Sequence, residues 1–321
     1  MIMEDSIVSA AQLEVEIAQI TQEAEGVVSL ILRAPDGTAL PTWQAGAHID
    51  VILPNGLVRQ YSLCGDAQDC STWRISILHE REGRGGSAYL HGHIKAGDRI
   101  RVSQPRNNFK LAEAEHYKFV AGGIGITPIL AMIHEAEAAG KSWSLLYGGR
   151  SRNTMAFLDD LARFGDKVTI APQDEVGLLD LGGYLGADDD GAHAYVCGPG
   201  PLIDAVEAQC ASWPAGRLHR ERFAPKQKIT AEPGGFEVQL AQSGERIYVP
   251  PDESLLDVLQ DAGHEVTNSC TAGICGTCLV NVLAGEPDHQ DDVLSDADRA
   301  SGKMMLVCVS RSKSDLLVLD L

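Results

Sequence analysis

Four of the eight cysteines lie near the end of the chain in the pattern C-x4-C-x2-C-x29-C: Cys270, Cys275, Cys278 and Cys308. Thiolates at this spacing are typical of a plant-type [2Fe–2S] cluster, because a tight loop brings three sulfurs together and a distant strand supplies the fourth. Gly273 and Gly276 lie inside the loop, where the missing Cβ lets backbone N–H groups approach the cluster sulfides. The cysteines therefore predict a one-electron redox centre.

Two other interpretations of these cysteines stay open. Core cysteines can share such a spacing by chance, and a structural zinc site is the second possibility. Zinc sites usually use two C-x2-C knuckles, whereas this chain has a single one, Cys275–Cys278, which argues against zinc. Cys64, Cys70 and Cys210 are interpreted as structural or free thiols.

A glycine-rich turn follows a short apolar segment in the middle of the chain. The residues that would form it are Gly122, Gly123, Gly125 and Pro128. Glycines let a backbone approach a pyrophosphate, and the N-terminus of a following helix offers unpaired N–H groups. A glycine turn alone is weak evidence, since close packing of a strand and a helix favours the same residues.

A second turn, Cys197-Gly198-Pro199, ends another predicted strand. Ligands of open α/β sheets bind at the carboxyl ends of strands, so we expect both turns to face one crevice. Taken alone, Cys197 has a second interpretation as a buried structural thiol.

The first third of the chain carries residues suited to a flavin: Arg59, Gln60, Tyr61 and Ser62, and further on Arg84, Gly85, Gly86 and Ser87. Tyr61 would supply an aromatic face and Ser62 a polar contact near N5. Arg59 and the Gly85–Ser87 backbone would form an anion site for the phosphate. The competing interpretations are a solvated arginine and a plain hairpin turn.

Three kinds of element would position these residues. Short alternating segments from Leu13 to Val102 predict an antiparallel β-barrel. From residue 117 strands alternate with helices, including one expected at Thr154–Arg163, which predicts a doubly wound parallel sheet. The Pro- and Gly-containing segment Lys226–Gly235 is the expected linker to a third domain. The expected domains are 1–112, 113–228 and 235–321.

Composition excludes some functions. The net charge of −19 argues against nucleic acid, because binding phosphates requires a basic surface. The first ten residues lack the apolar run of a signal peptide, and the longest apolar stretch, 121–133, is shorter than the roughly 20 residues of a membrane span. We therefore expect a soluble cytoplasmic protein without a membrane partner.

Taken together, the motifs resemble the phthalate dioxygenase reductase family over nearly the whole chain. The resemblance rests on the residues Arg59–Leu63, Arg84–Ser87, Pro105–Phe109, Gly122–Pro128, Tyr147–Ser151, Cys197–Pro199 and Glu221–Phe223, and on the four cysteines. It implies an FMN barrel, a nicotinamide-binding α/β domain and a C-terminal β-grasp ferredoxin. It further implies flavin contacts from Leu63, Ile77, Leu78 and Thr127, with Phe223 covering the flavin face where nicotinamide enters.

The resemblance implies a reductase that moves electrons from NADH through FMN and [2Fe–2S] to a terminal oxygenase. Ser62, Cys197 and Phe223 would contact the reacting groups. A Rieske non-haem iron oxygenase is favoured as acceptor over a cytochrome P450, and a monomer is expected. The nicotinamide choice depends on Arg150 and Arg152, which could accept a 2′-phosphate, while Ser151 between them favours neither nucleotide. The resemblance favours NADH. Two alternatives are a redox sensor without turnover and direct oxidation of a substrate on the flavin.

Overall fold

The computed structural model describes residues 12–186, 191–225 and 234–321. The chain forms two compact units, Gln12–Phe223 and Ala224–Leu321, and each is described by itself. The expected boundary at residue 228 and most of the expected linker lie outside the described residues.

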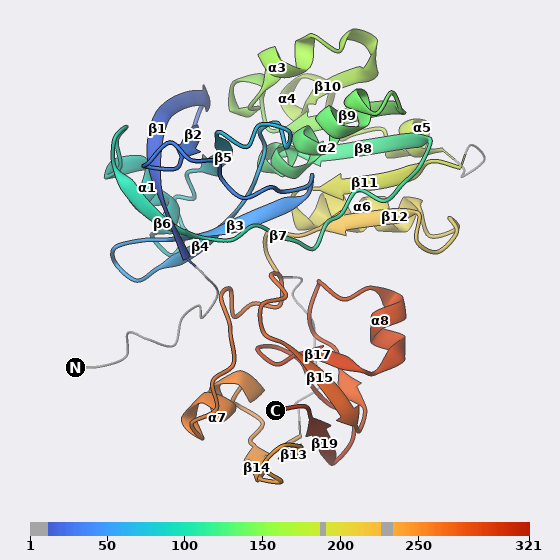
Figure 1. The fold of residues 1–321 in the computed structure, drawn as a ribbon. Helices are drawn as coiled ribbons and strands as arrows, with labels where there is room; N and C mark the ends of the chain where they lie inside the picture. Colours follow the sequence, from blue (N-terminus) through green and yellow to red (C-terminus); the bar gives the residue numbers. More distant parts are fainter. Residues whose placement is uncertain (1–11, 187–190, 226–233) are drawn as a thin grey trace. The chain divides into compact units, whose positions relative to one another are not determined.

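The first half of the larger unit is an antiparallel barrel (Figure 1). Its strands run in the order β4-β3-β6-β1-β2-β5, and β7 pairs with β3. The edge strands meet through a bridge between Leu63 and Ile75, and the Cys64 N–H donates to the Arg74 carbonyl at 2.9 Å. The elements are β1 (Gln12–Ala24), β2 (Val27–Arg33), β3 (Ala47–Ile52), β4 (Val58–Ser62), β5 (Trp73–Leu78), α1 (Gly86–Gly92), β6 (Arg99–Ser103) and β7 (Arg106–Asn107).

The predicted barrel is confirmed, and its alternating sequence explains it. Val15, Ile17, Leu30 and Ile75 are fully buried, because every second side chain of a strand points to the same face. The segment after β5 differs from the hairpin interpretation: Gly85 adopts a left-handed conformation (φ 82°) and a helix, α1, begins at the next residue. The helix has only seven residues and a glycine at each end, which is too short for an apolar period, and the sequence therefore did not predict it.

The second half of the larger unit is a five-stranded parallel sheet in the order β10-β9-β8-β11-β12. Its elements are β8 (His116–Gly122), η1 (Gly123–Gly125), α2 (Ile126–Ala138), β9 (Ser142–Gly149), η2 (Arg152–Thr154), α3 (Leu158–Ala162), η3 (Gly165–Lys167), β10 (Val168–Pro172), α4 (Gln173–Val176), α5 (Leu181–Leu185), β11 (His193–Cys197), α6 (Gly200–Gln209) and β12 (Leu218–Glu221). The predicted doubly wound sheet is confirmed.

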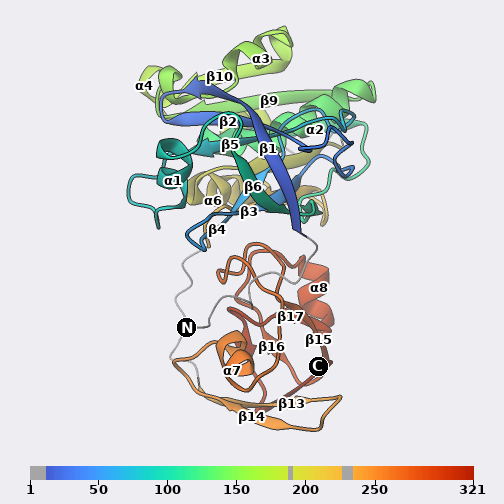
Figure 2. The same cartoon turned by 60° about the vertical axis from the view of Figure 1, so that its left-hand side comes forward.

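Helices cover both faces of this sheet (Figure 2). Along β8, Phe119 belongs to the apolar cluster that contains α2, whereas the next residue, Val120, belongs to the cluster with Ile203 of α6. The α2 cluster continues into the barrel, so the two halves of the unit share one core. The strand order reverses between β8 and β11, which places the ligand crevice of such a fold at the ends of these two strands.

The helix expected at Thr154–Arg163 is shorter than predicted. A 3-10 turn, η2, comes first, and Phe157 then adopts a left-handed conformation (φ 65°) before α3 begins. A bulky side chain at positive φ interrupts a helix, and the apolar pattern of the sequence gives no sign of it. The strand β12 was not predicted either, because Leu-His-Arg-Glu lacks an alternating apolar pattern.

The smaller unit contains a mixed sheet in the order β14-β13-β19-β15-β17, with β13 parallel to β19. Leu255 and Leu259 of α7 pack in its core with Val238 of β13. The elements are β13 (Phe236–Leu240), β14 (Arg246–Val249), α7 (Leu255–Asp261), β15 (Leu279–Ala284), β16 (Pro287–Asp288), α8 (Asp296–Ser301), β17 (Met304–Leu306), β18 (Arg311–Ser312) and β19 (Leu316–Leu319). The order of sheet and helix confirms the expected β-grasp domain.

None of the helices in the described part of the chain combines the length and the apolar character that a membrane span requires.

Candidate functional site

The two strand-end turns of the parallel sheet pack backbone against backbone. A Cβ atom added to Gly125 would lie 2.3 Å from the Cys197 carbonyl oxygen, and one added to Gly198 would lie 3.0 Å from the Gly122 Cα. The separation at Gly125 is too short for any side chain, and the one at Gly198 would require the neighbouring backbone to shift. The structure thus brings the turn after β8 and the turn after β11 together at the reversal of strand order.

The first turn of α2 is fixed by polar contacts with buried side chains. Thr127, which is 2% exposed, donates its hydroxyl to the Ile124 carbonyl at 3.0 Å, and Pro128 is buried beside it. The Tyr147 hydroxyl donates to the Gly123 carbonyl at 3.2 Å. These contacts hold the amide groups of the turn in place before any ligand arrives.

A basic side chain lies across the start of α1 in the barrel. The Arg59 guanidinium donates to the Arg84 carbonyl at 2.9 Å, and a Cβ on Gly86 would lie 2.5 Å from the Arg59 Nε. The Ser87 hydroxyl accepts from the Glu80 N–H at 3.1 Å, which ties the start of the helix to the end of β5. Arg59 and the Gly85–Ser87 backbone are therefore adjacent, as an anion site requires.

Side chains of β4 alternate between two directions. Tyr61 shares the face of Arg59, and burial raises its pKa. Gln60 lies on the opposite face and donates to Asp50 at 3.1 Å, and Asp50 in turn pairs with Arg106 at 2.8 Å. The structure thus places Gln60 in a buried ionic network and away from the Arg59 and Tyr61 face.

Other predicted flavin residues lie at the ends of β4 and β5. Ser62 and Leu63 are buried at the end of β4. β5, which ends with Ile77 and Leu78, contacts η1, so the barrel reaches the turn of the parallel sheet. The Ile77 carbonyl is also 3.0 Å from the Nε2 of His91 in α1.

A buried carboxyl group to which the sequence analysis gave no role lies beside Cys197. Glu221 is the register partner of Cys197 in the parallel pair of β11 and β12. Its Oε2 is buried without a hydrogen-bond partner among the described residues, and burial raises its pKa to about 8. Burial and the nearby Glu221 carboxyl together raise the pKa of Cys197. Cys197 is therefore a neutral thiol at the end of β11.

The residues after Glu221 are attached to α6. Arg222 is almost fully buried and donates to Asp204 at 2.7 Å and to Glu207 at 3.3 Å. Phe223 follows with 41% of its surface exposed. The ion pairs of Arg222 with Asp204 and Glu207 hold the start of this segment at the same edge of the sheet as Cys197.

Arg150 and Ser151 follow β9, two strands away from the end of β11. Ser151 caps η2 with Thr154, and Arg150 is exposed. Arg152 donates to both oxygens of Glu175, at 3.1 and 2.9 Å, so its guanidinium is already engaged.

The cysteine loop of the smaller unit is curled by residues of positive φ. Thr271, Gly273 and Gly276 have φ of 50°, 71° and 73°. The Ala272 N–H donates to the Cys270 sulfur at 3.3 Å, and the Gly273 N–H is directed at the sulfur of Cys308. The loop therefore surrounds the cysteine sulfurs with backbone donors.

The four sulfurs interact as two pairs, Cys270 with Cys275 and Cys278 with Cys308. Hydrogen bonding from Cys270, and also from Thr277, lowers the pKa of Cys275 to about 5, whereas the neighbouring thiols raise the pKa of Cys270 and of Cys308. Within the described residues, no three His, Cys, Asp or Glu side chains are spaced to share one ion. Two pairs suit the two irons of a binuclear cluster, whose positive charge lets four adjacent thiolates coexist.

Two family models match the chain. The "2Fe-2S iron-sulfur cluster binding domain" covers residues 238–313, and the "oxidoreductase NAD-binding domain" covers residues 119–208. They confirm the predicted cluster and the predicted nicotinamide nucleotide.

Similar proteins match over nearly the whole length. Phenoxybenzoate dioxygenase subunit beta from Ectopseudomonas oleovorans is 45% identical over 313 residues, which is 97% of this chain and 98% of that protein. The structure of phthalate dioxygenase reductase is described as modular for electron transfer from pyridine nucleotides to [2Fe–2S]. It is 38% identical to this chain with a TM-score of 0.72, and the match covers 97% of this chain and 98% of that one. An intact type IV self-sufficient cytochrome P450 monooxygenase is 42% identical with a TM-score of 0.91, covering 97% of this chain and 41% of that one.

Proposed function

Since this chain belongs to the phthalate dioxygenase reductase family, we propose that it oxidises NADH and delivers single electrons to the terminal component of a multicomponent oxygenase. The observation that supports this most directly is the presence, in one chain, of the packed Gly125–Cys197 turns and the four-cysteine loop. The packed turns suit the binding of a two-electron donor, and the four-cysteine loop suits a one-electron carrier. The cofactors of the family are FMN, NADH and [2Fe–2S].

The turns at the end of β8 and β11 would bind NADH. Their amide groups and the N-terminus of α2 suit its pyrophosphate, and the proposed contacts are Gly122, Gly123, Gly125, Thr127, Pro128, Cys197, Gly198 and Pro199. Phe223, held at the same sheet edge by Arg222, would yield its place to the nicotinamide ring. Positioning is then the main task of the protein, and no side chain has to act as a general base.

The barrel would bind FMN through residues that already lie close together. Arg59 and Gly85–Ser87 would hold the phosphate, with Tyr61 on the ring face and Ser62 near N5. Leu63, Ile77, Leu78, Arg84, Arg150 and Ser151 complete the proposed contact set for the flavin and the nucleotide. When bound, FMN accepts hydride and the cluster at the four cysteines passes on single electrons.

The proposed acceptor is a Rieske-type oxygenase. Residues 236–321 carry 15 acidic and 5 basic side chains, a net charge of −10, which would attract a basic patch on a partner. A cytochrome P450 is the second candidate, because the reductase-like part of a self-sufficient P450 is 42% identical to this chain. We further propose that the chain acts as a cytoplasmic monomer with three domains, 1–112, 113–228 and 235–321.

Reconstitution distinguishes the two acceptors. The purified chain is mixed with NADH and either a Rieske oxygenase or a P450, and NADH consumption coupled to product is measured. Coupled turnover with the Rieske oxygenase, falling as salt rises, is the expected result. Coupled turnover with the P450 alone would identify a P450, and not a Rieske oxygenase, as the acceptor. Coupled turnover with neither would contradict the proposed function.

NADH should be preferred over NADPH, because the Arg152 guanidinium is engaged by Glu175 and is not offered to a 2′-phosphate. Glu175→Gln should release Arg152 and raise kcat/KM for NADPH about tenfold, the effect of one charge-assisted contact, while kcat/KM for NADH stays unchanged. Steady-state assays with both nucleotides measure this. A wild-type preference for NADPH would mean that Arg150 supplies the phosphate contact.

Glu221 should make stability depend on pH. Its pKa is raised to about 8 in the folded chain, so it favours folding fully below the ordinary carboxyl pKa, and this contribution is lost as pH rises toward 8. Glu221→Gln should flatten the decline in the free energy of unfolding between about pH 5 and pH 8. All four tryptophans lie in Gln12–Phe223, so their fluorescence during urea unfolding reports on this unit. Glu113→Gln, at an exposed position, is the control. If it flattened the pH dependence of the free energy of unfolding as much as Glu221→Gln, the prediction would be contradicted.

A further inference from the structure

A buried carboxylate outside the predicted ligand set lies between β16 and α8 of the smaller unit. Asp291 has no exposed surface, and its Oδ2 accepts from the N–H groups of Val293 and Leu294 at 3.0 and 2.8 Å. These two backbone N–H groups replace part of the hydration that the buried carboxylate loses. The segment therefore holds a negative charge in the interior of the unit.

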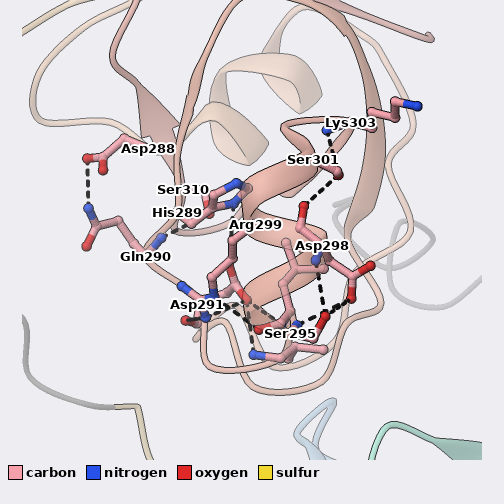
Figure 3. A network of polar contacts seen from close by, with 12 residues as sticks. Asp288, His289, Gln290, Asp291, Ser295, Asp298, Arg299, Ser301, Lys303 and Ser310 are labelled. Atoms are coloured by element: carbon pink, nitrogen blue, oxygen red, sulfur yellow. Dashed lines mark hydrogen bonds and ion pairs between the residues drawn. The ribbon is translucent and has the colours of Figure 1, made fainter. Parts of the chain in front are cut away.

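Arg299 on α8 is the cationic partner of Asp291, and Figure 3 shows its side chain pointing from the helix to the carboxylate. Its Nη2 lies 3.3 Å from the Asp291 Oδ2 and 2.5 Å from the Asp291 carbonyl oxygen, while its Nε donates to Leu294 at 3.0 Å. Arg299 is 23% exposed and Asp291 is not exposed at all, so water screens the cation more than the anion. The negative field of the pair is therefore the stronger one inside the unit.

His289 does not add a second cation at neutral pH. Its Nδ1 lies 3.9 Å from the Asp291 Oδ1, and burial lowers its pKa. The nearby Asp288 and Asp298 are engaged with Gln290 and with Ser295, so each faces a neutral partner within this network (Figure 3).

The same segment lies directly against the cysteine loop. The Asp292 N–H donates to the Gly273 carbonyl at 2.9 Å, and a Cβ on Gly273 would lie 3.1 Å from the Asp291 Cα. Gly273 in turn directs its N–H at Cys308. On the other side, the Gln290 N–H donates to Ser310, two residues after Cys308. Asp291 thus lies between the loop that carries three of the sulfurs and the turn after β17 that carries Cys308, which was expected on a strand.

We propose that the Asp291–Arg299 pair sets the reduction potential of the cluster. A carboxylate fixed in the interior against the cysteine loop disfavours the added electron, and the partly exposed Arg299 moderates that effect. Asp291 is accordingly a positioning and electrostatic residue, and it is not a ligand. The inference rests on the proposed function, namely that Cys270, Cys275, Cys278 and Cys308 hold a [2Fe–2S] cluster.

Opposite charge changes test the inference. Asp291→Asn keeps the shape of the side chain and should move the midpoint potential to more positive values. The ratio of reduced to oxidised cluster at a fixed solution potential should rise about tenfold, or about 59 mV for a one-electron couple. Arg299→Gln should move the potential in the negative direction. The control, Asp296→Asn, removes the same formal charge from an exposed position of α8 and should leave the potential unchanged.

The measurement is an anaerobic redox titration of the full-length holoprotein followed by visible and EPR spectra, with iron analysis of each variant. If the pair had a purely structural role, Asp291→Asn and Arg299→Gln would move the midpoint potential in the same direction or leave it unchanged. Either result would overturn the inference. Loss of iron from both variants while Asp296→Asn retains it would also overturn the inference, because the pair would then serve folding. Absence of iron and sulfide from the wild type would contradict the proposed function itself.

Discussion

Cys308→Ala should reduce electron delivery to a one-electron protein acceptor to background while leaving NADH oxidation by ferricyanide intact. The side chain pairs with Cys278 and is the proposed ligand from outside the tight loop, so its loss would leave one iron without its second cysteine. Ferricyanide takes electrons from the flavin directly and does not need the cluster. The variant therefore distinguishes NADH oxidation at the flavin from electron delivery through the cluster.

Cys70→Ala is the matched control for this variant, because it removes a thiol of the same chain that lies outside the loop. It should retain both activities and a full iron content. The account would be contradicted if Cys308→Ala kept two irons per chain and normal delivery to the protein acceptor.

Gly125→Ala should lower kcat/KM for NADH by about a hundredfold, the scale expected when a binding turn is displaced by about 1 Å. The new methyl group would lie 2.3 Å from the Cys197 carbonyl oxygen, so the turns after β8 and β11 must separate. Stopped-flow reduction of the flavin by NADH measures the effect on binding and on hydride transfer. Cluster content should be unchanged, because the cysteines belong to the other unit.

Gly200→Ala controls for a glycine change in the same region. At this position the nearest atom, the Arg222 Nη1, would lie 3.7 Å from the added Cβ, an ordinary van der Waals contact. NADH reduction of this variant should match the wild type. Equal rates in Gly125→Ala and the wild type would show that the close packing of the two turns has no part in nucleotide binding.

Sequence reasoning predicted the fold well where local signals and global packing agree. The alternation of Val15 and Ile17 or of Ile75 and Ile77 predicts barrel strands, and the barrel forms. It failed where a single dihedral decides the outcome, as at Phe157, whose positive φ delays α3. Helix α1 was missed for a related reason, since its first residue is a glycine within a glycine run.

The candidate site shows the same division. The spacing of the cysteines and the positions of Gly122, Gly125 and Cys197 at strand ends can be recognised in the sequence, because both follow from local geometry. Glu221 cannot be recognised in this way, since its proximity to Cys197, 24 residues earlier in the sequence, depends on the register of two strands. Asp291 is likewise one of many acidic residues until the fold buries it.

The most direct test of the account is an anaerobic titration of the purified protein with NADH, followed by EPR quantification of the reduced cluster. The account predicts a signal that reaches one unpaired electron per chain, because hydride enters through the Gly125–Cys197 turns and electrons arrive at the four cysteines. Flavin bleaching without any cluster signal, in protein that contains iron and sulfide, would show that the two units do not exchange electrons and would contradict the account.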